Sequence, residues 1–187
     1  MKGWKKKRDI MRRYDATAQI YDARYEEEQT AKYAAALENL QKRELKLVLD
    51  VGCGTGLLFS HITQMSRRII GVDISRKTLL KAKERTKNLT NVEVILADAD
   101  FIPLRENIVD RLFAITVLQN SPNPAQTLNE SKRISKTEAD IVITGLKKVF
   151  SLEDFRDLLQ KAGLRVECFV DEETLKCYVA MCKKMYH

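Results

Sequence analysis

The alternation of apolar and polar positions divides the chain from residue 45 onward into short apolar stretches and longer amphipathic ones. Residues 45–51 are apolar at most positions, which is typical of a central strand covered on both faces of a sheet. Similar stretches predict further strands at 68–73, 92–97, 109–117, 139–145, 164–170 and 174–182. Helices are predicted between most of them, so the alternation predicts an α/β fold.

Capping residues mark where the predicted helices begin. Ser75, Asn123 and Ser151 each precede an amphipathic segment, and their side chains can accept hydrogen bonds from the first N–H groups of a helix. Pro124 favours the first helical position, and Gly163 would end the last helix. The helices expected on these grounds cover 76–88, 124–136 and 152–162, and a further helix is expected over 57–65.

The last two predicted strands are joined by a very short connection. Only Asp171, Glu172 and Glu173 separate them, which leaves no room for a crossover helix. We therefore expect these strands to form an antiparallel hairpin at the end of an otherwise parallel sheet.

Three glycines follow the first predicted strand directly. Gly52, Gly54 and Gly56 stand at alternate positions between a strand and a helix, where N–H groups can face a ligand with no Cβ in the way. Asp73 ends the next strand, and a carboxylate at that place in a doubly wound sheet accepts hydrogen bonds from ribose hydroxyls. The third glycine of a dinucleotide-binding G-x-G-x-x-G turn would fall at Leu57, so the pattern favours another nucleoside cofactor.

Three motifs in order resemble those of the class I S-adenosylmethionine-dependent methyltransferases, of the small, single-domain, type-11-like kind. They are Leu49–Gly56, Gly71–Ser75 and Leu96–Ala99, and the resemblance covers roughly residues 14 to 182. It implies a doubly wound, seven-stranded, mostly parallel Rossmann-like sheet with an antiparallel last strand. It also implies S-adenosyl-L-methionine as cofactor, with Asp73 at the ribose, Asp98 and Ala99 at the adenine, and Asp50 with the glycine turn at the methionine end. The cofactor-binding residues expected are Tyr21, Asp50, Gly52, Cys53, Gly54, Gly56, Asp73, Ile74, Asp98, Ala99 and Thr116.

The segment before residue 45 differs in character. Tyr14-Asp15 and Tyr21-Asp22 recur in a stretch rich in Ala, Glu, Gln and Lys that predicts one or two helices. In methyltransferases that resemble this chain, such a segment lies over the cofactor, so 14–44 is expected to be a helical lid on the α/β core, 45–187. Tyr21 is the candidate for a cofactor contact, because a tyrosine face attracts a sulfonium by roughly 0.5–2 kcal/mol. The alternative is that these tyrosines only pack the helix onto the sheet.

Positive charge is concentrated at the start of the chain. The net charge is +7, and residues 1–13 hold seven Lys or Arg against one Asp, which leaves +1 for the single domain 14–187. A basic arm carrying Trp4 is typical of a nucleic-acid contact, and RNA is the partner expected at residues 2–13. A solubilising tail is the alternative.

The strand 109–117 brings Thr116 to Asn120 to the carboxyl end of the sheet, where ligands bind in such folds. Gln119 and Asn120 are candidates for orienting an acceptor. Asn120-Ser121-Pro122-Asn123 lacks the second proline and the aromatic ring of enzymes that methylate exocyclic base amines, which argues against that chemistry. Methylation of pyrimidine carbon 5 needs a cysteine in this region, and none occurs between 54 and 167. No residue is assigned as catalytic, since methyl displacement needs no obligatory acid or base.

These observations predict a methyltransferase that acts on RNA, either tRNA or rRNA. A small-molecule acceptor is the alternative, and a non-catalytic cofactor-binding subunit of a partner complex is a third; an activator subunit is possible with any of them. The cysteines form no C-x-x-C pair and there are two histidines, so no metal site is expected. No apolar run reaches the ~20 residues of a membrane span, and the expected location is the cytoplasm.

Overall fold

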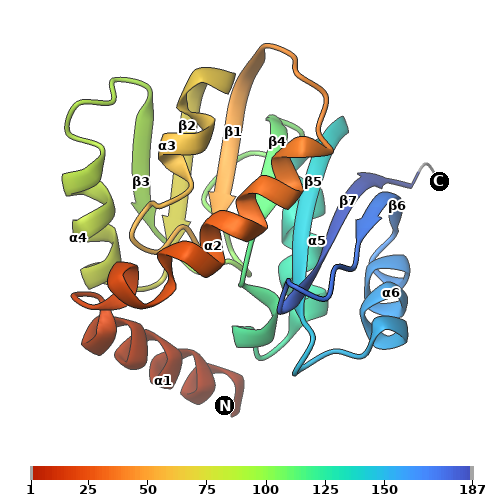
Figure 1. Ribbon diagram of the computed structural model, residues 1–187, viewed down its shortest axis with the longest axis horizontal. Helices are drawn as coiled ribbons and strands as arrows, with labels where there is room; N and C mark the ends of the chain where they lie inside the picture. The colour runs from red at the N-terminus through yellow and green to blue at the C-terminus, as the bar shows by residue number, and fades with distance from the viewer. Residues whose placement is uncertain (1, 186–187) are drawn as a thin grey trace.

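A computed structural model describes residues 2–185, which form one seven-stranded sheet with helices on both faces (Figure 1). The strands are β1 (Leu45–Val51), β2 (Ser66–Asp73), β3 (Val92–Leu96), β4 (Val109–Ala114), β5 (Ser135–Leu146), β6 (Leu164–Val170) and β7 (Cys177–Lys184). Their order in the sheet is β3-β2-β1-β4-β5-β7-β6. The helices are α1 (Lys2–Thr17), α2 (Tyr21–Glu38), α3 (Phe59–Ile62), α4 (Arg76–Arg85), α5 (Pro124–Ile134) and α6 (Leu152–Lys161), with 3-10 turns at Thr63–Met65 and Leu118–Asn120.

The predicted doubly wound fold is confirmed. β1 to β5 pair in parallel, whereas β7 runs antiparallel to both β5 and β6. β7 lies between β5 and β6, so the hairpin that the short connection required places the last strand inside the sheet.

The two faces of the sheet carry separate apolar cores. On β1, Val48 points to the core beneath α2, α3 and α4, while Leu49 points to the core beneath α5 and α6. Both side chains are fully buried, and burying each contributes roughly 1.5–3 kcal/mol. Alternate positions of one strand thus hold the two helical layers to the same sheet.

Several elements differ from their predicted bounds. β4 ends at Ala114 rather than 117, because Thr116 adopts a left-handed conformation with φ of 65° that no strand accommodates. α5 ends at Ile134, and β5 begins at once, because Ser135 already pairs with Val109 of β4. The helix predicted over 57–65 is only a four-residue α-helix followed by a 3-10 turn, and β7 begins at Cys177 after a turn in which Leu175 N donates to Glu172 O.

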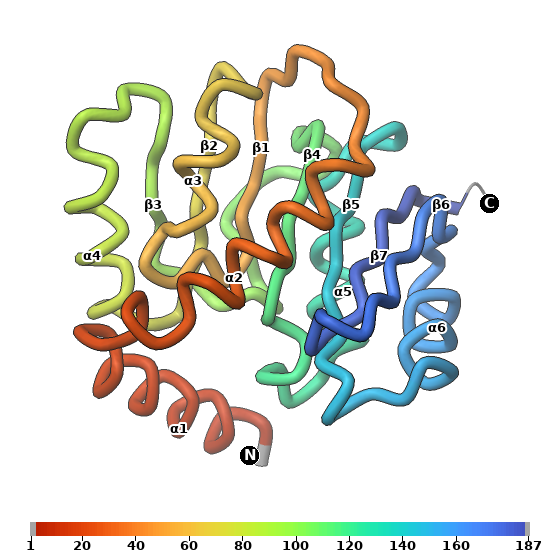
Figure 2. Tube along the Cα trace, in the orientation of Figure 1, coloured from red at the N-terminus to blue at the C-terminus, as the bar shows by residue number. Residues whose placement is uncertain are grey.

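The basic segment at the start of the chain is helical. Residues 2–17 form α1, so the expected boundary between an arm and the domain at residue 13 falls inside one helix. α1 lies across the carboxyl ends of the parallel strands, and α2 then runs over one face of the sheet (Figure 2). No helix in residues 2–185 is long and apolar enough to cross a membrane.

Candidate active site

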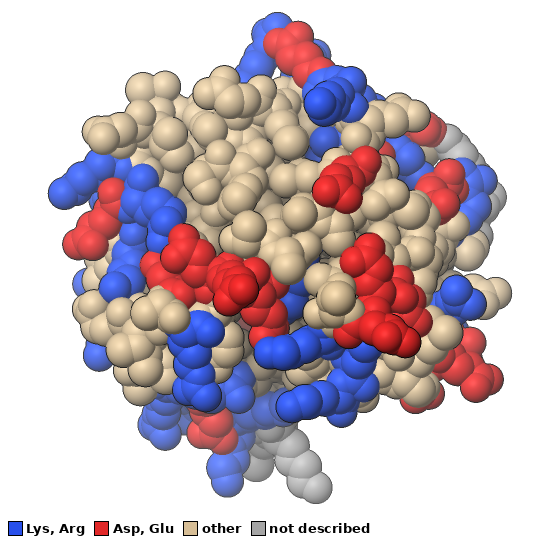
Figure 3. Space-filling model, in the orientation of Figure 1, with Lys and Arg blue, Asp and Glu red and all other residues tan. Residues whose placement is uncertain are grey.

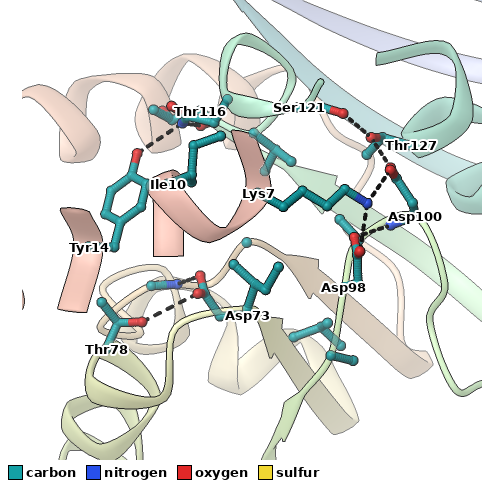
Figure 4. Close-up of a pocket in the computed structure, with 18 of the residues that line it drawn as sticks. Lys7, Ile10, Tyr14, Asp73, Thr78, Asp98, Asp100, Thr116, Ser121 and Thr127 are labelled. Carbon is teal, nitrogen blue, oxygen red and sulfur yellow. Dashed lines mark hydrogen bonds and ion pairs between the residues drawn. The ribbon is translucent and has the colours of Figure 1, made fainter. Parts of the chain in front are cut away.

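A cavity of about 110 Å³ lies at the carboxyl ends of β1, β2 and β4, with α1 as its outer wall (Figure 4). Its lining contains eight of the eleven predicted cofactor residues: Tyr21, Gly52, Gly54, Asp73, Ile74, Asp98, Ala99 and Thr116. Asn120, predicted for the acceptor, also lines it. Residues far apart in the sequence are therefore brought to one place, as the doubly wound topology requires.

The glycine turn is fastened to β2 and shaped by left-handed backbone. The N–H groups of Gly52 and Cys53 donate to Val72 O at 2.7 and 3.0 Å. Gly52, Gly54 and Gly56 have φ of 70°, 55° and 77°, which only glycine adopts at little cost. A Cβ on Gly52 or Gly56 would lie 2.6 Å from Val117 or Phe59, whereas a Cβ on Gly54 would meet nothing within 4 Å. The open space over Gly54, in the cavity wall, fits a ligand that approaches the backbone closely.

Asp73 connects the glycine turn to the start of α4. Its Oδ2 accepts from Gly54 N at 2.9 Å, and its Oδ1 accepts from Ser75 N at 2.8 Å and from Thr78 Oγ1 at 3.3 Å. Burial raises the pKa of Asp73, and this effect outweighs the hydrogen bonds, which lower the pKa. A carboxylate oxygen has room for two donors, so Oδ2 can accept one more from a ribose hydroxyl.

Three predicted residues lie behind the cavity wall instead of in its lining. Asp50 is buried on β1, and burial together with the nearby Asp73 carboxylate raises its pKa well above the ordinary value. Burial likewise raises the pKa of the Cys53 thiol, which packs in the core beside Gly71. Gly56 packs against Phe59. Asp50, Cys53 and Gly56 therefore support the turn from behind.

Asp98 and Asp100 hold a lysine that the sequence did not single out for this place. Lys7 Nζ of α1 lies 2.6 Å from Asp98 Oδ2 and 2.5 Å from Asp100 Oδ2, with its side chain 12% exposed. Burial lowers the pKa of the Lys7 amine, but its bonds to Asp100 and Asp98 outweigh this effect and the pKa is raised. Asp100 also accepts from Thr127 Oγ1 at 2.6 Å, so this carboxylate is fixed from two sides.

The two Tyr-Asp pairs, Tyr14-Asp15 and Tyr21-Asp22, place their tyrosines in the cavity and their aspartates against the elements around it. Tyr14 and Tyr21 both line the cavity, with ring centroids 6.1 Å apart, and burial raises the pKa of each phenol. Asp15 accepts from Ser75 Oγ and Lys77 N at the start of α4. Asp22 accepts from Thr55 Oγ1 in the glycine turn and from Arg85. The recurrence of Tyr-Asp was the signal that could have placed Tyr14 here, because in each pair the tyrosine lines the cavity and the aspartate beside it bonds the neighbouring structure.

The far end of the cavity is built on Thr116. Its N–H donates to Thr144 Oγ1, and its hydroxyl lies 3.2 Å from both Gln29 Oε1 and Lys32 Nζ. Lys32 is 1% exposed and pairs with Glu28 at 2.8 Å. Sequence reasoning missed this buried cation because its amphipathic helix carries many polar residues.

Asn120 is the junction between this end of the cavity and α1. Its Nδ2 donates to Tyr14 Oη at 2.9 Å and to Thr116 O at 3.0 Å, and its Oδ1 accepts from Arg13 at 2.7 Å. Gln119 does not line the cavity, and within the described residues its Oε1 is buried without a hydrogen-bond partner. Only Asn120 of the two predicted acceptor residues therefore faces the cavity.

Comparisons with known proteins agree with this geometry. A family model described as "Methyltransferase domain" matches residues 49–143. The malonyl-[acyl-carrier protein] O-methyltransferase of Marinomonas is 28% identical over 76% of this chain and 53% of its own length. A SAM-dependent methyltransferase structure from Aquifex aeolicus matches with a TM-score of 0.74 and 25% identity, over 82% of this chain and 89% of that one.

A second structure, a Haloferax volcanii methyltransferase in complex with the Trm112 activator, matches with a TM-score of 0.80 over 93% of this chain and 96% of that one. Its identity of 18% makes this a likeness of fold. The chain spans between 32% and 53% of the length of the first curated relatives that it matches.

Proposed function

The chain belongs to the class I S-adenosylmethionine-dependent methyltransferases, and from that premise we propose that it transfers the cofactor's methyl group to RNA, either tRNA or rRNA. The observation that carries the RNA acceptor is the position of α1, whose Lys7, Ile10 and Tyr14 line the cavity while Lys5, Arg8 and Arg12 are exposed. The basic surface and the cofactor site are thus two sides of one helix.

The outward side of α1 has the composition of a nucleic-acid contact. Its exposed basic residues include Lys5, Lys6, Arg8 and Arg12, and Figure 3 shows Lys and Arg side chains along the lower edge of the molecule, where α1 lies. Trp4 and Phe101 are 58% and 71% exposed. Cations that pair with phosphates, together with exposed rings on which bases stack, are the means by which proteins bind single-stranded or looped RNA.

We assign three regions of the cavity to parts of the cofactor. Asp73 would hold the ribose, Asp98 and Ala99 the adenine, and the space over Gly54 the methionine end. Bound S-adenosylmethionine supplies a methyl group on a positively charged sulfur, which an acceptor atom removes by in-line displacement. The rings of Tyr14 and Tyr21 would favour that positive charge, and Asn120 would orient the acceptor by hydrogen bonds. Positioning of this kind supplies much of the rate acceleration without an acid or base.

Incubation with radiolabelled S-adenosylmethionine tests the proposal. The protein is given fractionated total RNA or a small-molecule extract, and the expected result is label in a tRNA or rRNA fraction. Asp73→Ala, which removes the ribose acceptor, is the control that ties labelling to this cavity. Label confined to the small-molecule extract would contradict an RNA acceptor.

A small acyl acceptor is the second candidate. The relative from Marinomonas acts, by its name, on a malonyl group of a carrier protein, and α1 covers the cavity on one side, which suits a compact substrate. If the acceptor is a small acyl group, no methyl group is transferred to RNA. Removal of the charges of Lys5, Lys6, Arg8 and Arg12 then leaves the turnover rate unchanged.

An activator subunit is a further part of the proposal that the same assay examines. The Haloferax volcanii methyltransferase was solved with an activator, so labelling is measured with the chain alone and again after addition of a Trm112-type protein. Labelling that needs the added protein would make this chain one subunit of a larger enzyme.

A further inference from the structure

Lys7 occupies a position that the cofactor would need. Its ammonium group pairs with Asp98 at 2.6 Å, and Asp98 is the residue proposed to meet the adenine. An amine of the adenine ring and the lysine ammonium are both donors, so they compete for the same carboxylate oxygens. The adjacent Asp100 is 6% exposed and strengthens the hold on the lysine, because its Oδ2 lies 2.5 Å from Nζ.

α1 is the helix that the fold holds least firmly. None of its side chains from Gly3 to Thr17 is fully buried, whereas α2 buries Tyr33, Ala35 and Ala36 against the sheet. The contacts of α1 are mainly polar: Lys7 with the two aspartates, Arg13 and Tyr14 with Asn120, and Asp15 with Ser75. An element with little buried apolar surface separates from the rest of a protein at low cost.

The cavity under α1 is too small for a nucleoside cofactor in the arrangement described. Its volume is about 110 Å³, against roughly 300–1,000 Å³ for sites that enclose drug-sized ligands. The floor consists of strand ends and of a glycine turn fastened to β2, so the wall that can yield is α1.

We propose that Lys7 is an internal latch, which closes α1 over the cofactor cavity by pairing with Asp98 and Asp100 and which the cofactor must displace in order to bind. This inference rests on the proposed position of the cofactor. Displacement frees Lys7 and loosens α1, and the freed ammonium group adds to the basic residues that α1 already exposes to RNA phosphates. Loading of the cavity therefore strengthens binding of the acceptor.

The latch is tested by the affinity and association rate of S-adenosylhomocysteine, measured by calorimetry and stopped flow. Lys7→Met keeps the apolar stem but removes the competing charge, so we expect roughly three- to tenfold tighter binding and faster association, since a closed state lowers apparent affinity by its population. Lys5→Met, at an exposed position of the same helix, is the matched control and should bind as the wild type does. Unchanged or weaker binding by Lys7→Met would overturn the latch.

Trp4, the one tryptophan of the chain, reports directly on α1. Its fluorescence anisotropy should fall when S-adenosylhomocysteine saturates the wild type, and it should already be low in Lys7→Met before ligand is added. Equal anisotropy with and without ligand in the wild type would also overturn the proposal. If Asp73→Ala weakens cofactor binding but Lys7→Met leaves it unchanged, the latch alone is wrong. If Asp73→Ala leaves binding intact, the cofactor binds elsewhere and both proposals are wrong.

Discussion

At the scale of single residues, Gly54 differs from its two neighbours in the glycine turn. All three have left-handed backbone, but only Gly54 has open space where a Cβ would stand. Gly52 and Gly56 are required by packing against Val117 and Phe59. The sequence shows three equivalent glycines, and only the fold separates the one with open space at its Cβ position from the two that pack against side chains.

Gly54→Val should therefore separate binding from folding. The branched side chain would fill the space where a ligand meets the backbone, so we expect cofactor affinity to fall by ~100-fold or more. The left-handed conformation should cost about 1–2 kcal/mol of unfolding free energy. Calorimetry and chemical unfolding measure the two effects. Gly56→Val is the comparison: its Cβ would lie 2.6 Å from the Phe59 ring, so it should lose more stability. Normal cofactor binding by Gly54→Val would show that residues 52–56 are not the cofactor turn.

Asp50 gives a prediction about pH. Burial, together with the Asp73 carboxylate, raises the pKa of Asp50 in the folded protein, so the folded state binds more protons than the unfolded state between the ordinary aspartate pKa and the raised one. Stability must then fall as pH rises through that window. Asp50→Asn removes this titration, and its unfolding free energy relative to the wild type should rise between pH 5 and pH 8. A constant difference across that range would show that Asp50 titrates normally.

At the scale of elements, Gln29 and Lys32 connect α2 to the segment after β4 through Thr116. This buried lysine reaches both Glu28 and Thr116, and Thr116 keeps a conformation that is costly for a β-branched residue. Periodicity predicted helices before residue 45, and resemblance to the family placed them over the cofactor. The left-handed conformation of Thr116 could not be predicted from the sequence, because its hydrogen-bond partners Gln29, Lys32 and Thr144 are distant in sequence.

The two lysines that pair with Glu28 allow a matched test of burial. Lys32 is 1% exposed and Lys176 is 66% exposed, and each binds one oxygen of the same carboxylate. Lys32→Met should lower the unfolding free energy by about 2 kcal/mol, because it removes the partly buried ion pair with Glu28 and the hydrogen bond to Thr116. Lys176→Met should change it by less than about 1 kcal/mol, as for exposed ion pairs. If chemical unfolding shows equal losses of unfolding free energy for the two variants, burial of Lys32 adds nothing to the stability of the protein.

At the scale of the whole molecule, the asymmetry of charge predicts how RNA binding depends on salt. Glutamine at Lys5, Lys6, Arg8 and Arg12 removes four outward charges of α1, so the slope of log affinity against log salt should become shallower by up to about 3. The control removes four exposed charges at the amino ends of the strands, far from the cavity, at Lys42, Lys46, Arg67 and Arg68. Filter binding at several salt concentrations compares the two variants. Equal slopes for both would point to the small acyl acceptor.

The fold and the cofactor motifs were accessible from the sequence because each depends on local patterns: buried strands, a glycine turn and a carboxylate at a strand end. The position of Lys7 was not accessible, since its partners Asp98 and Asp100 lie more than 90 residues away. A run of basic residues also does not reveal which side chain turns inward. Periodicity and motif spacing do not predict contacts between side chains that are distant in sequence, and such contacts form the wall of the cavity.

The place of β7 in the sheet has a consequence for biosynthesis. β6 is made before β7, but among the described residues it pairs only with β7, which itself pairs with β5. While a ribosome still holds Cys177–Lys184, α6 can already pack on β5 through Phe155, but β6 has no strand to join. The nascent chain therefore exposes the unpaired edges of β5 and β6 until β7 emerges. This hairpin is the part of the molecule for which a chaperone at the ribosome exit would matter most.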